Sequence, residues 1–526
     1  MTALEDRTRS GRSTSLLGSK DIINSILPPE LFSKIFEIGT DMDEETSDDT
    51  LDVAKLDEGS KSGTSYNKAY FNSLDFASLV SQICSTWREI ALSTPTLWGY
   101  LYVADETPVE MITTWLDRSK AVPLDIEIDL ENKGQRTVHD FMPFLITHIS
   151  RWRSFRCHMA IAGQILQVMA YLVGKDAPAL EVLTLDDPDN LENIWYKHIV
   201  HSIFAGPGSL PKLKFLTLWS SPMVWASRPF ANLVYLQLGS IKEGARPTVK
   251  QFVTLLQGSP TLESLLMSGD MFDPDDPFRS SGQVPDPITL DSLQHLIIKG
   301  FKTPSSVNHT LRLFNAPRLI QLDISDLCFD SEGEPLDFSS TFDLLSDGVF
   351  PKLEMLRMAY VICANPRSLE GWFCNLTGLQ KLNLVIPRAP RDDPVGNSSQ
   401  DLVETELPLH FLRAFVPPKL RSTLELPILP VHLVCPVLEE ITASGIPGNI
   451  LVSCAEARKS QGVPLKRIMH DARDKVNGLC RERLEELGVE LTEYEETCYG
   501  VESDDDEGMD EESSTTLQRK STPEDR

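Results

Sequence analysis

Residues 211–218 read PKLKFLTL, a proline-marked string of alternating apolar side chains that recurs several times along the chain. Leu216 and Leu218 are two residues apart, so in a strand both side chains point to the same face. Leu213 is expected to turn into the same core, while Pro211 starts the strand without needing a ladder donor. The other strict copies are PALEVLTL (178–185), PTLESLLM (260–267), PRLIQLDI (317–324) and PKLEMLRM (351–358).

The first leucine of each copy recurs at intervals of 20 to 34 residues, with an average of about 28, which is the period of leucine-rich repeats. One such unit cannot cover its own apolar face, so stacked units bury it against each other. We therefore predict an α/β fold over residues 102–492: an irregular leucine-rich-repeat solenoid with a parallel sheet on its concave side. The leucines, including those of copies without the proline, lie at positions 180, 213, 233, 262, 293, 319, 353 and 379.

Weaker segments fit the same scheme. In RWRSFRC (151–157), Trp152, Phe155 and Cys157 occupy the positions that are apolar in the repeat. GVPLKRIM (462–469) is expected to be the closing strand, followed by a charged helix. The asparagine that usually follows Leu-x-Leu is missing from the repeats, so their turn geometry and curvature stay open. Two further candidate strands are PLDIEIDL (123–130) and PVLEEITA (436–443).

The chain is acidic, with a net charge of −28 from 77 acidic and 49 basic residues, but this charge is concentrated. Residues 41–58 hold nine acids and one lysine, and residues 493–512 hold eleven acids and no base. We expect both segments to be solvated, because blocks of like charge resist compaction. The net negative field argues against direct nucleic-acid binding, and RWRSFR (151–156) is better explained as a repeat strand.

The sequence carries no motif of a catalytic, cofactor or metal site. GxSxG, HExxH, GxxxxGK[ST] and GxGxxG are missing, and the ten histidines do not pair with cysteines at ligand spacing. We therefore expect a protein that is not an enzyme and needs no cofactor or metal. Nine scattered cysteines favour a reduced compartment, cytoplasmic and/or nuclear. No apolar run approaches the roughly 18 residues of a membrane span, so no membrane partner is expected.

Near the start of the chain, residues 22–38 read IINSILPPELFSKIFEI and predict an amphipathic helix. Pro28 and Pro29 suit a first helical turn, where the amide would be unpaired in any case. The spacing predicts one apolar face made of Leu31, Ile35 and Ile38, with Phe32 and Phe36 on its flank.

A second amphipathic segment, FASLVSQICSTWREIALSTPTLWGYL, covers residues 76–101. Its apolar side chains follow helical spacing, and Thr94 with Pro95 is expected to end that helix and begin another. The helical face is predicted to comprise Leu79, Ile83, Trp87 and Ile90. One explanation for both helical segments is a cap that hides the apolar end of the solenoid.

These two strings also resemble the F-box-like module of fungal F-box/leucine-rich-repeat proteins. The shared features are the LPxELxxxIF start, the C-xx-W-R-x-I-A centre and the TPxLW end. The resemblance implies a small helical module that docks on the Skp-type adaptor, and through it the cullin, of a Skp–cullin–F-box ubiquitin ligase. Carried over by motif position, the adaptor-facing candidates are Leu27, Pro28, Leu31, Ile35, Ile83, Trp87 and Trp98. Trp87 is equally well explained as a core residue.

The domain organisation that follows has a helical module over residues 21–101 and the repeats over 102–492. An acidic insert, residues 40–73, is expected to loop out of the module as disorder, since helix connections are usually much shorter. Residues 1–20 and the acidic tail, residues 493–526, are likewise expected to be disordered.

The resemblance implies that the repeats select a protein substrate for degradation, so that the chain is a non-catalytic substrate receptor. Side chains between the core leucines point out from the concave sheet, and aromatic and Arg side chains often anchor interfaces. The substrate-facing candidates are Phe215, Trp219, Tyr235, His295, Lys299 and Arg357. The alternative is a repeat scaffold for protein–protein interaction that is not linked to ubiquitination and whose helices serve only as a cap.

Overall fold

The computed structural model shows an α/β protein built around one long, curved parallel sheet. The predictions for residues 1–20, for most of the acidic insert and for the tail beyond 494 concern residues outside the described set. The structure describes residues 27–45, 76–130, 137–160, 164–187, 203–206, 208–221, 223, 225, 230–273, 276, 286–325, 336–346, 350–386, 434–474 and 476–494.

Within the described residues the sheet has 14 strands, and each strand pairs in parallel with its neighbours. Strand order follows chain order throughout, so each new unit adds its strand beside the previous one. In order they are β1 (Tyr100–Val103), β2 (Leu124–Leu130), β3 (Trp152–Met159), β4 (Val182–Asp186), β5 (Phe215–Trp219), β6 (Tyr235–Gly239), β7 (Ser264–Ser268), β9 (His295–Lys299), β11 (Gln321–Ser325), β12 (Met355–Ala359), β13 (Lys381–Val385), β14 (Glu440–Ser444), β15 (Arg467–Asp471) and β16 (Glu490–Tyr494).

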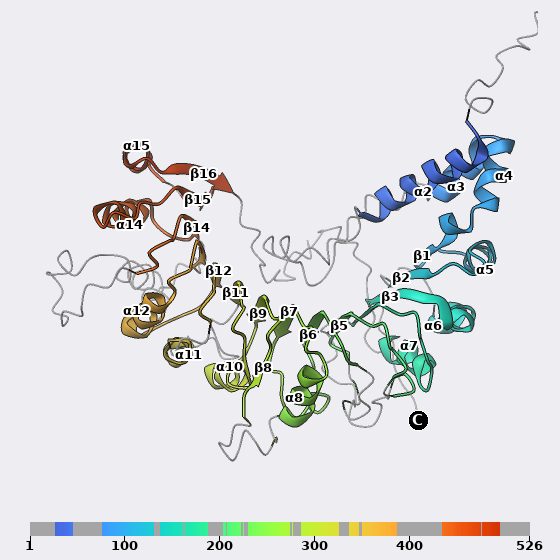
Figure 1. Ribbon diagram of the computed structural model, residues 1–526, viewed down its shortest axis with the longest axis horizontal. Coiled ribbons are helices and arrows are strands. Elements are labelled where there is room, and N and C mark those ends of the chain that lie inside the picture. The colour runs from blue at the N-terminus through green and yellow to red at the C-terminus, as the bar shows by residue number, and fades with distance from the viewer. Residues whose placement is uncertain are drawn as a thin grey trace, which may run out of the picture.

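The molecule is an arch, with the strands along its inner side and helices along its outer side (Figure 1). The predicted parallel sheet on the concave side is therefore confirmed. A short pair, β8 (Ile288–Thr289) with β10 (Phe314–Asn315), forms a separate parallel sheet. The helices between strands are α5 (Val109–Arg118), α6 (Val138–Leu145), α7 (Gln164–Leu172), α8 (Val249–Gln257), α10 (Pro304–Leu311), α11 (Ser339–Leu345), α12 (Pro366–Asn375), α14 (Gly448–Ser460) and α15 (Gly478–Leu487). Among the described helices, none has the length and apolar character that crossing a bilayer requires.

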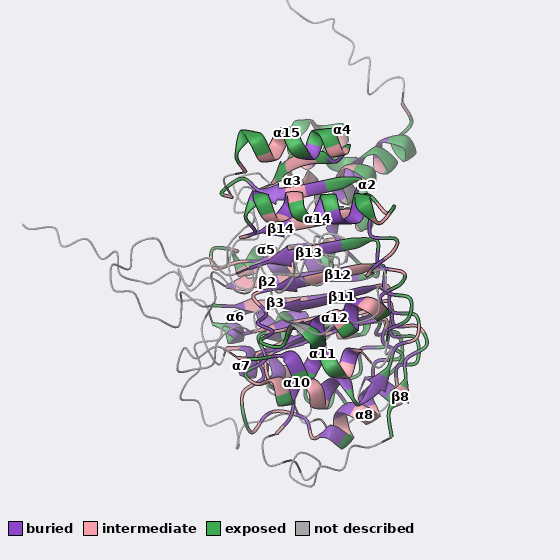
Figure 2. Ribbon diagram, turned by 90° about the vertical axis from the view of Figure 1, so that its left-hand side faces the viewer, coloured by how far each residue is buried: buried purple, intermediate pink, exposed green. Residues whose placement is uncertain are grey.

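The periodic leucines form the core between sheet and helices. Each lies two residues before a strand, and Leu213, for example, precedes β5. In β4 to β15 of the main sheet the second and fourth residues of the strand are buried against the same core, as Leu216 and Leu218 are with no exposed surface. Seen from the side, the strands lie one above another and most of their residues are buried, while exposed residues are concentrated in the helices at both ends of the arch (Figure 2). No leading leucine is more than 1% exposed: Leu180, Leu213, Leu233, Leu262, Leu293, Leu319, Leu353 and Leu379.

The prolines of the repeat occupy a different position from the one predicted. Pro211 lies four residues before β5, not at its first residue. The amide of Leu213 donates to the carbonyl of Leu210 at 3.3 Å, so Pro211 stands second in a β-turn. The fixed φ of proline suits that turn position, which is the physical reason it recurs there.

A second regularity joins neighbouring units just before the strands of the main sheet from β5 to β15, where one carbonyl accepts two amides of the next unit. The Glu354 carbonyl accepts from Gln380 at 2.8 Å and from Lys381 at 3.0 Å. The Gln380 carbonyl accepts in the same way from Glu439 at 2.9 Å and Glu440 at 3.1 Å. The β13 to β14 step therefore has the same register as the others, although residues 387–433, outside the described set, intervene.

In place of the asparagine that is missing from the repeats, several strands are followed directly by a residue with a left-handed backbone conformation. Gly269 has φ of 78°, and its amide donates to the Lys299 carbonyl of the next unit at 2.9 Å. Gly445 needs glycine for a second reason, since a Cβ there would stand 2.5 Å from the Ile386 carbonyl oxygen. The other residues that take positive φ directly after a strand are Ser220, Ser240, Gly300 and Tyr360.

The sheet also continues beyond its predicted end. The 462–469 segment forms β15, but α15 and a further strand, β16, follow it. β16 pairs in parallel with β15, so β16 and not β15 is the last strand of the sheet. The predicted charged helix is α15.

Candidate functional site

In the part of the N-terminal module that the structure describes, three helices and a short 3-10 helix lie at one end of the arch (Figure 1). The predicted helix over residues 22–38 begins at Pro29, and residues 22–26 lie outside the described set. It continues to Glu45, so the part of the predicted insert over residues 40–45 is helical and not a disordered loop. The elements are α2 (Pro29–Glu45), α3 (Phe76–Ile83), α4 (Ser85–Ser93) and η3 (Pro95–Trp98).

The second predicted helix is divided in two at Cys84. This residue has an extended backbone, with φ of −155° and ψ of 171°, and its sulfur accepts from the Trp87 amide at 3.4 Å. The division rotates α4 out of phase with α3, so the predicted single apolar face is wrong. Ile90 is buried, but Leu79 and Ile83 point outward.

The inner side of the module is an aromatic core. Phe32 and Phe36 of α2 are 3% and 1% exposed. The ring of Trp87 lies 5.6 Å from that of Phe32 and 5.1 Å from that of Phe36, measured between centroids. Trp87 therefore belongs mainly to this core, which was one of its two predicted roles, and the predicted flank of α2 is its buried face.

Trp98 is a correction to the predicted adaptor-facing set. Its side chain has no exposed surface, and its indole Nε1 donates to the Ala91 carbonyl at 2.9 Å. The ring packs edge-on against Trp115 of α5 at 4.7 Å, with the guanidinium of Arg118 at 4.4 Å. Trp98 thus joins the module to the first helix of the arch and offers no surface to a partner.

Polar contacts fix α2 against η3. The hydroxyls of Ser33 and Thr94 lie 2.9 Å apart, and the Thr96 hydroxyl donates to Glu37 at 2.8 Å. Thr94 also donates to the Ile90 carbonyl at 2.8 Å, which satisfies the end of α4. These bonds set the angle of α2 and so determine which of its faces remains outside.

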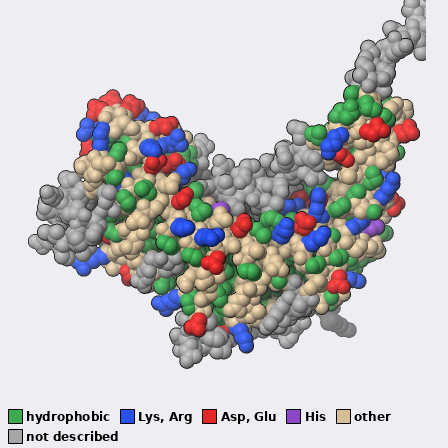
Figure 3. Space-filling model, viewed as in Figure 1, with side chains coloured by type: hydrophobic (Ala, Val, Ile, Leu, Met, Phe, Trp, Pro, Cys, Tyr) green, Lys and Arg blue, Asp and Glu red, His purple; other side chains and the backbone are tan. Residues whose placement is uncertain are grey.

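The outer side of the same helices is apolar and exposed. On α2, Leu31, Ile35 and Ile38 are each 49% exposed, and on α3 Leu79 and Ile83 are 46% and 56% exposed. Hydrophobic side chains gather on this end of the molecule (Figure 3). We call these five residues the outer apolar face of the module.

The predicted adaptor-facing residues thus divide into three groups. Leu31, Ile35 and Ile83 lie on the outer apolar face, and Pro28 is exposed beside it. Leu27 is half-buried and packs against the core. Trp87 and Trp98 serve the core. The structure adds Ile38 and Leu79 to the exposed set. The helical spacing of Ile38 from Leu31 is the feature of the sequence that could have indicated Ile38.

The concave surface brings together the six predicted substrate-facing residues. In β1 and in β4 to β15 of the main sheet, buried residues occupy the second and fourth positions, so the first, third and fifth positions face the inside of the arch. In β2, β3 and β16, the residues paired with those positions face the same way. We call these the concave positions. Strand pairing places the predicted residues on β5 to β12 at concave positions: Phe215, Tyr235 and His295 in the first, Arg357 in the third, Trp219 and Lys299 in the fifth.

Their exposure differs. The rings of Phe215 and Tyr235 are 6.5 Å apart, but Tyr235 is only 5% exposed and its hydroxyl donates to Gln237 at 2.8 Å. The Lys299 ammonium lies 5.8 Å from the centre of the Trp219 ring. Phe215 and Trp219 are partly exposed, whereas the buried ring of Tyr235 packs beside Phe215 and offers little surface to a partner.

Charged side chains lie among these aromatic residues. Arg357 Nη1 donates to Asp323 Oδ2 at 3.2 Å across the β11–β12 pair. Burial lowers the pKa of His295, so this ring tends to stay neutral. At the beginning of the arch, the Tyr100 hydroxyl donates to Glu127 at 2.8 Å, and burial followed by the Glu127 charge raises the pKa of Tyr100.

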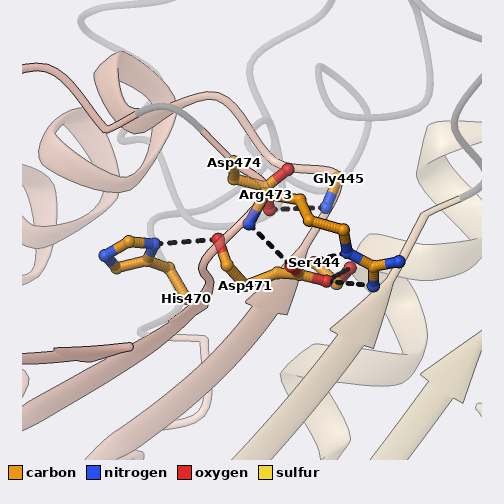
Figure 4. Close-up of polar contacts among 6 residues, drawn as sticks. All are labelled: Ser444, Gly445, His470, Asp471, Arg473 and Asp474. Carbon is orange, nitrogen blue, oxygen red and sulfur yellow. Dashed lines mark hydrogen bonds and ion pairs between the residues drawn. The ribbon is translucent and has the colours of Figure 1, made fainter. Parts of the chain in front are cut away.

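A polar cluster near the end of the sheet is structural. Asp471 has no exposed surface and accepts from the Ser444 hydroxyl at 3.0 Å (Figure 4). It also accepts from the amide and Nε of Arg473, both at 2.9 Å, while Asp474 accepts from the Gly445 amide at 2.8 Å. His470 donates from Nδ1 to the Asp471 carbonyl at 3.1 Å. Both carboxylates are occupied in holding the turns after β14 and β15, which leaves Asp471 unsuited to acid–base chemistry.

Two hollows, of about 550 and 330 Å³, lie along the edge of the sheet where the strands begin. Both are open, and Lys352 and Glu354 line both of them. Within the described residues, no three His, Cys, Asp or Glu side chains are placed to hold a metal ion.

Comparisons with known proteins give no assignment. The sequence matches no family model, and no curated protein matches it significantly.

Proposed function

We propose that this chain is the F-box-like substrate-recognition subunit of a Skp–cullin–F-box ubiquitin ligase. In this proposal the N-terminal helices dock on the Skp-type adaptor and, through it, on the cullin. The curved sheet of leucine-rich repeats binds a protein substrate on its concave side. The chain itself is non-catalytic, and its part in the reaction is to hold the substrate near the ligase.

The observation that carries the proposal is the outer apolar face. Five large aliphatic side chains about half exposed on two short helices are unusual in a monomer, and such patches mark interaction sites. Three of the five stand where the family resemblance places adaptor contacts: Leu31, Ile35 and Ile83. Burying the exposed half of each would contribute roughly 1 kcal/mol per side chain to the free energy of docking.

The alternative function, a repeat scaffold with the helices as a cap, uses different residues. Capping requires the inner side, where Phe32, Phe36 and Trp98 continue the core of the arch. It gives no reason for the outward halves of Leu31 and Ile35 to be apolar, because that half of each side chain is exposed in the described structure. Capping therefore depends on the inner side of the helices and docking on their outer apolar face, so substitutions on one side can test one function without affecting the other.

The test replaces two leucine-sized side chains of the outer apolar face with a good helix former: Leu31→Gln combined with Ile35→Gln. The matched control is Leu479→Gln, which changes a 78% exposed leucine of α15 at the other end of the arch. Binding of purified Skp-type adaptor is measured by calorimetry, and thermal unfolding reports whether each variant is folded.

We expect the parent and the control to bind the adaptor and the double variant to lose at least about tenfold in affinity, with its unfolding temperature unchanged. A folded parent that does not bind the adaptor, or a double variant that binds as well as the parent, would show the proposal to be wrong.

A further inference from the structure

The charge of the concave surface changes sign along the arch. At the concave positions of β2 to β4, Glu127, Asp129 and Asp186 outnumber Arg156. At those of β14 to β16, Glu440 and Glu490 outnumber Arg467. The strands between them reverse the balance.

From β5 to β13 the concave positions hold three cations and one carboxylate: Lys299, Arg357 and Lys381 against Asp323. We call this part the central concave surface. Figure 3 shows Lys and Arg side chains interspersed with hydrophobic ones along the inner edge of the arch. In a chain of net charge −28, a cationic surface between two acidic ones favours an acidic partner.

Apolar side chains occupy the same surface. Phe215 and Trp219 are partly exposed at one side of it, and Met355 is partly exposed at the other. Leu266 and Ile297 lie between them at concave positions of β7 and β9. Aromatic side chains are enriched among the residues that anchor protein interfaces. The surface thus suits a ligand with at least one large apolar side chain.

Three buried polar atoms, on β9, β11 and β13, have no hydrogen-bond partner among the residues that the structure describes. They are His295 Nδ1, Asp323 Oδ1 and Asn383 Oδ1. Asp323 is only 5% exposed, so leaving one of its oxygens unpaired costs about 1–3 kcal/mol. The two oxygens require donors, and an extended polypeptide presents a regular row of N–H groups.

From these observations we propose that the central concave surface binds an extended, acidic segment of a partner protein that carries a large apolar side chain. The apolar side chain packs on Phe215 and Trp219, and the carboxylates face Lys299 and Lys381. Backbone amides of the segment donate to Asp323 and Asn383. This inference rests on the proposed function, because it names the class of substrate that the receptor selects.

The dimensions fit such a ligand. Seven strands spaced about 4.8 Å apart span roughly 29 Å, which an extended segment of about nine residues crosses at 3.3 Å per residue. The acidic segments of the chain itself, residues 41–58 and 493–512, have the same charge and are the obvious competing occupants.

The experiment selects ligands without bias, from a phage-displayed library of random nonapeptides on the immobilised full chain. We expect enrichment of Asp and Glu together with Trp, Phe or Leu. The best peptide is then synthesised, and its affinity is measured for the parent and for the variant Lys299→Glu with Lys381→Glu. The matched control, Lys352→Glu, reverses an exposed lysine in the turn before β12, outside the concave surface.

The double variant is expected to bind at least about tenfold more weakly, while the control binds like the parent and high salt weakens both. Enrichment of basic peptides, no enrichment, or an unchanged affinity of the double variant would overturn the inference. So would acidic binding that arises only after residues 495–526 are removed, since the tail would then be the occupant. Adaptor binding measured on the same preparations separates the two proposals, because it fails only if the proposed function fails.

Discussion

The indole ring of Trp219 lies over Gly239 on the next strand, so close that a Cβ at residue 239 would stand 2.3 Å from two ring carbons. Gly239 has no positive φ, so its backbone would accept another residue. The glycine is therefore required by the aromatic side chain beside it, and it allows that ring to lie flat across the sheet.

Gly239→Ala should lower the free energy of unfolding by about 1–3 kcal/mol, because the ring must leave its position to make room. The entropic gain of replacing glycine, about 0.4–1 kcal/mol, would act in the opposite direction. Urea unfolding measures the difference. Gly478→Ala is the control, since nothing lies within 4 Å of the added atom. Equal stability of the two variants would contradict the close contact.

The buried side chain of Arg458 connects α14 to the segment over residues 434–438, just before β14. It is 1% exposed, and its guanidinium donates to the carbonyls of Val434, Cys435 and Leu438 at 3.0–3.1 Å. Arg458→Ala should cost about 3 kcal/mol or more, because buried carbonyls lose charged donors. The control is Arg483→Ala, an exposed arginine on α15 whose ion pairs are with Glu456 and Glu486. Equal unfolding temperatures of the two variants would show that the hydrogen bonds of the buried Arg458 guanidinium contribute little to stability.

The stability should depend on pH through His158. Burial alone would lower its pKa, but the hydrogen bond to Asp186 at 3.2 Å, with the surrounding carboxylates, raises it above the ordinary value. The folded state then favours the protonated ring. Its stabilising contribution is complete below about pH 6.5 and is lost as pH rises through the raised pKa.

Unfolding of the parent and of His158→Gln, followed between about pH 6 and pH 9, should therefore show a difference that shrinks toward high pH. His148 supplies the opposite sign, because burial and then the Arg151 charge lower its pKa. Its contribution is lost as pH falls below the ordinary value. If His148→Gln followed the same trend with pH as His158→Gln, the assigned directions of the two pKa shifts would be wrong.

Thiol reactivity should differ between two neighbouring helices. Burial raises the pKa of Cys454 on α14 to about 11, and that of Cys435 to about 12. Cys480 on α15 is partly exposed. In the native protein at about pH 8, iodoacetamide should modify Cys480 well before Cys454, because only the thiolate reacts. Peptide mass spectrometry measures the order, and equal rates would contradict it, since denaturation alone should equalise them.

The sheet could be predicted because its core signal is repetitive. Leu213, Leu216 and Leu218 recur with one spacing, and every copy adds independent evidence for the same strand. The concave positions followed from the two-residue alternation of a strand, so the predicted surface residues fall on the inside of the arch. The left-handed turns escaped prediction because Ser240 or Tyr360 at positive φ carries no signal in composition.

The helical module was less predictable. On α2 both apolar rows have helical spacing, and periodicity alone does not say whether Leu31 or Phe32 faces inward. The packing of Trp87 against Phe36 decides it, and that contact crosses residues far apart in the sequence. Trp98 was assigned to the surface by motif position, but its neighbour Trp115 lies beyond the motif.

The carbonyl of Gln380 accepts hydrogen bonds from the amides of Glu439 and Glu440. It thus joins β13 to β14, the two adjacent strands that are furthest apart in the sequence, and their pairing is the same as elsewhere in the sheet. Doubling the length of such a connection costs only about 0.6 kcal/mol of closure entropy. The seam between β13 and β14 is therefore a natural splice point, where a fluorescent protein or a second recognition module can be grafted while the rungs on either side stay as they are.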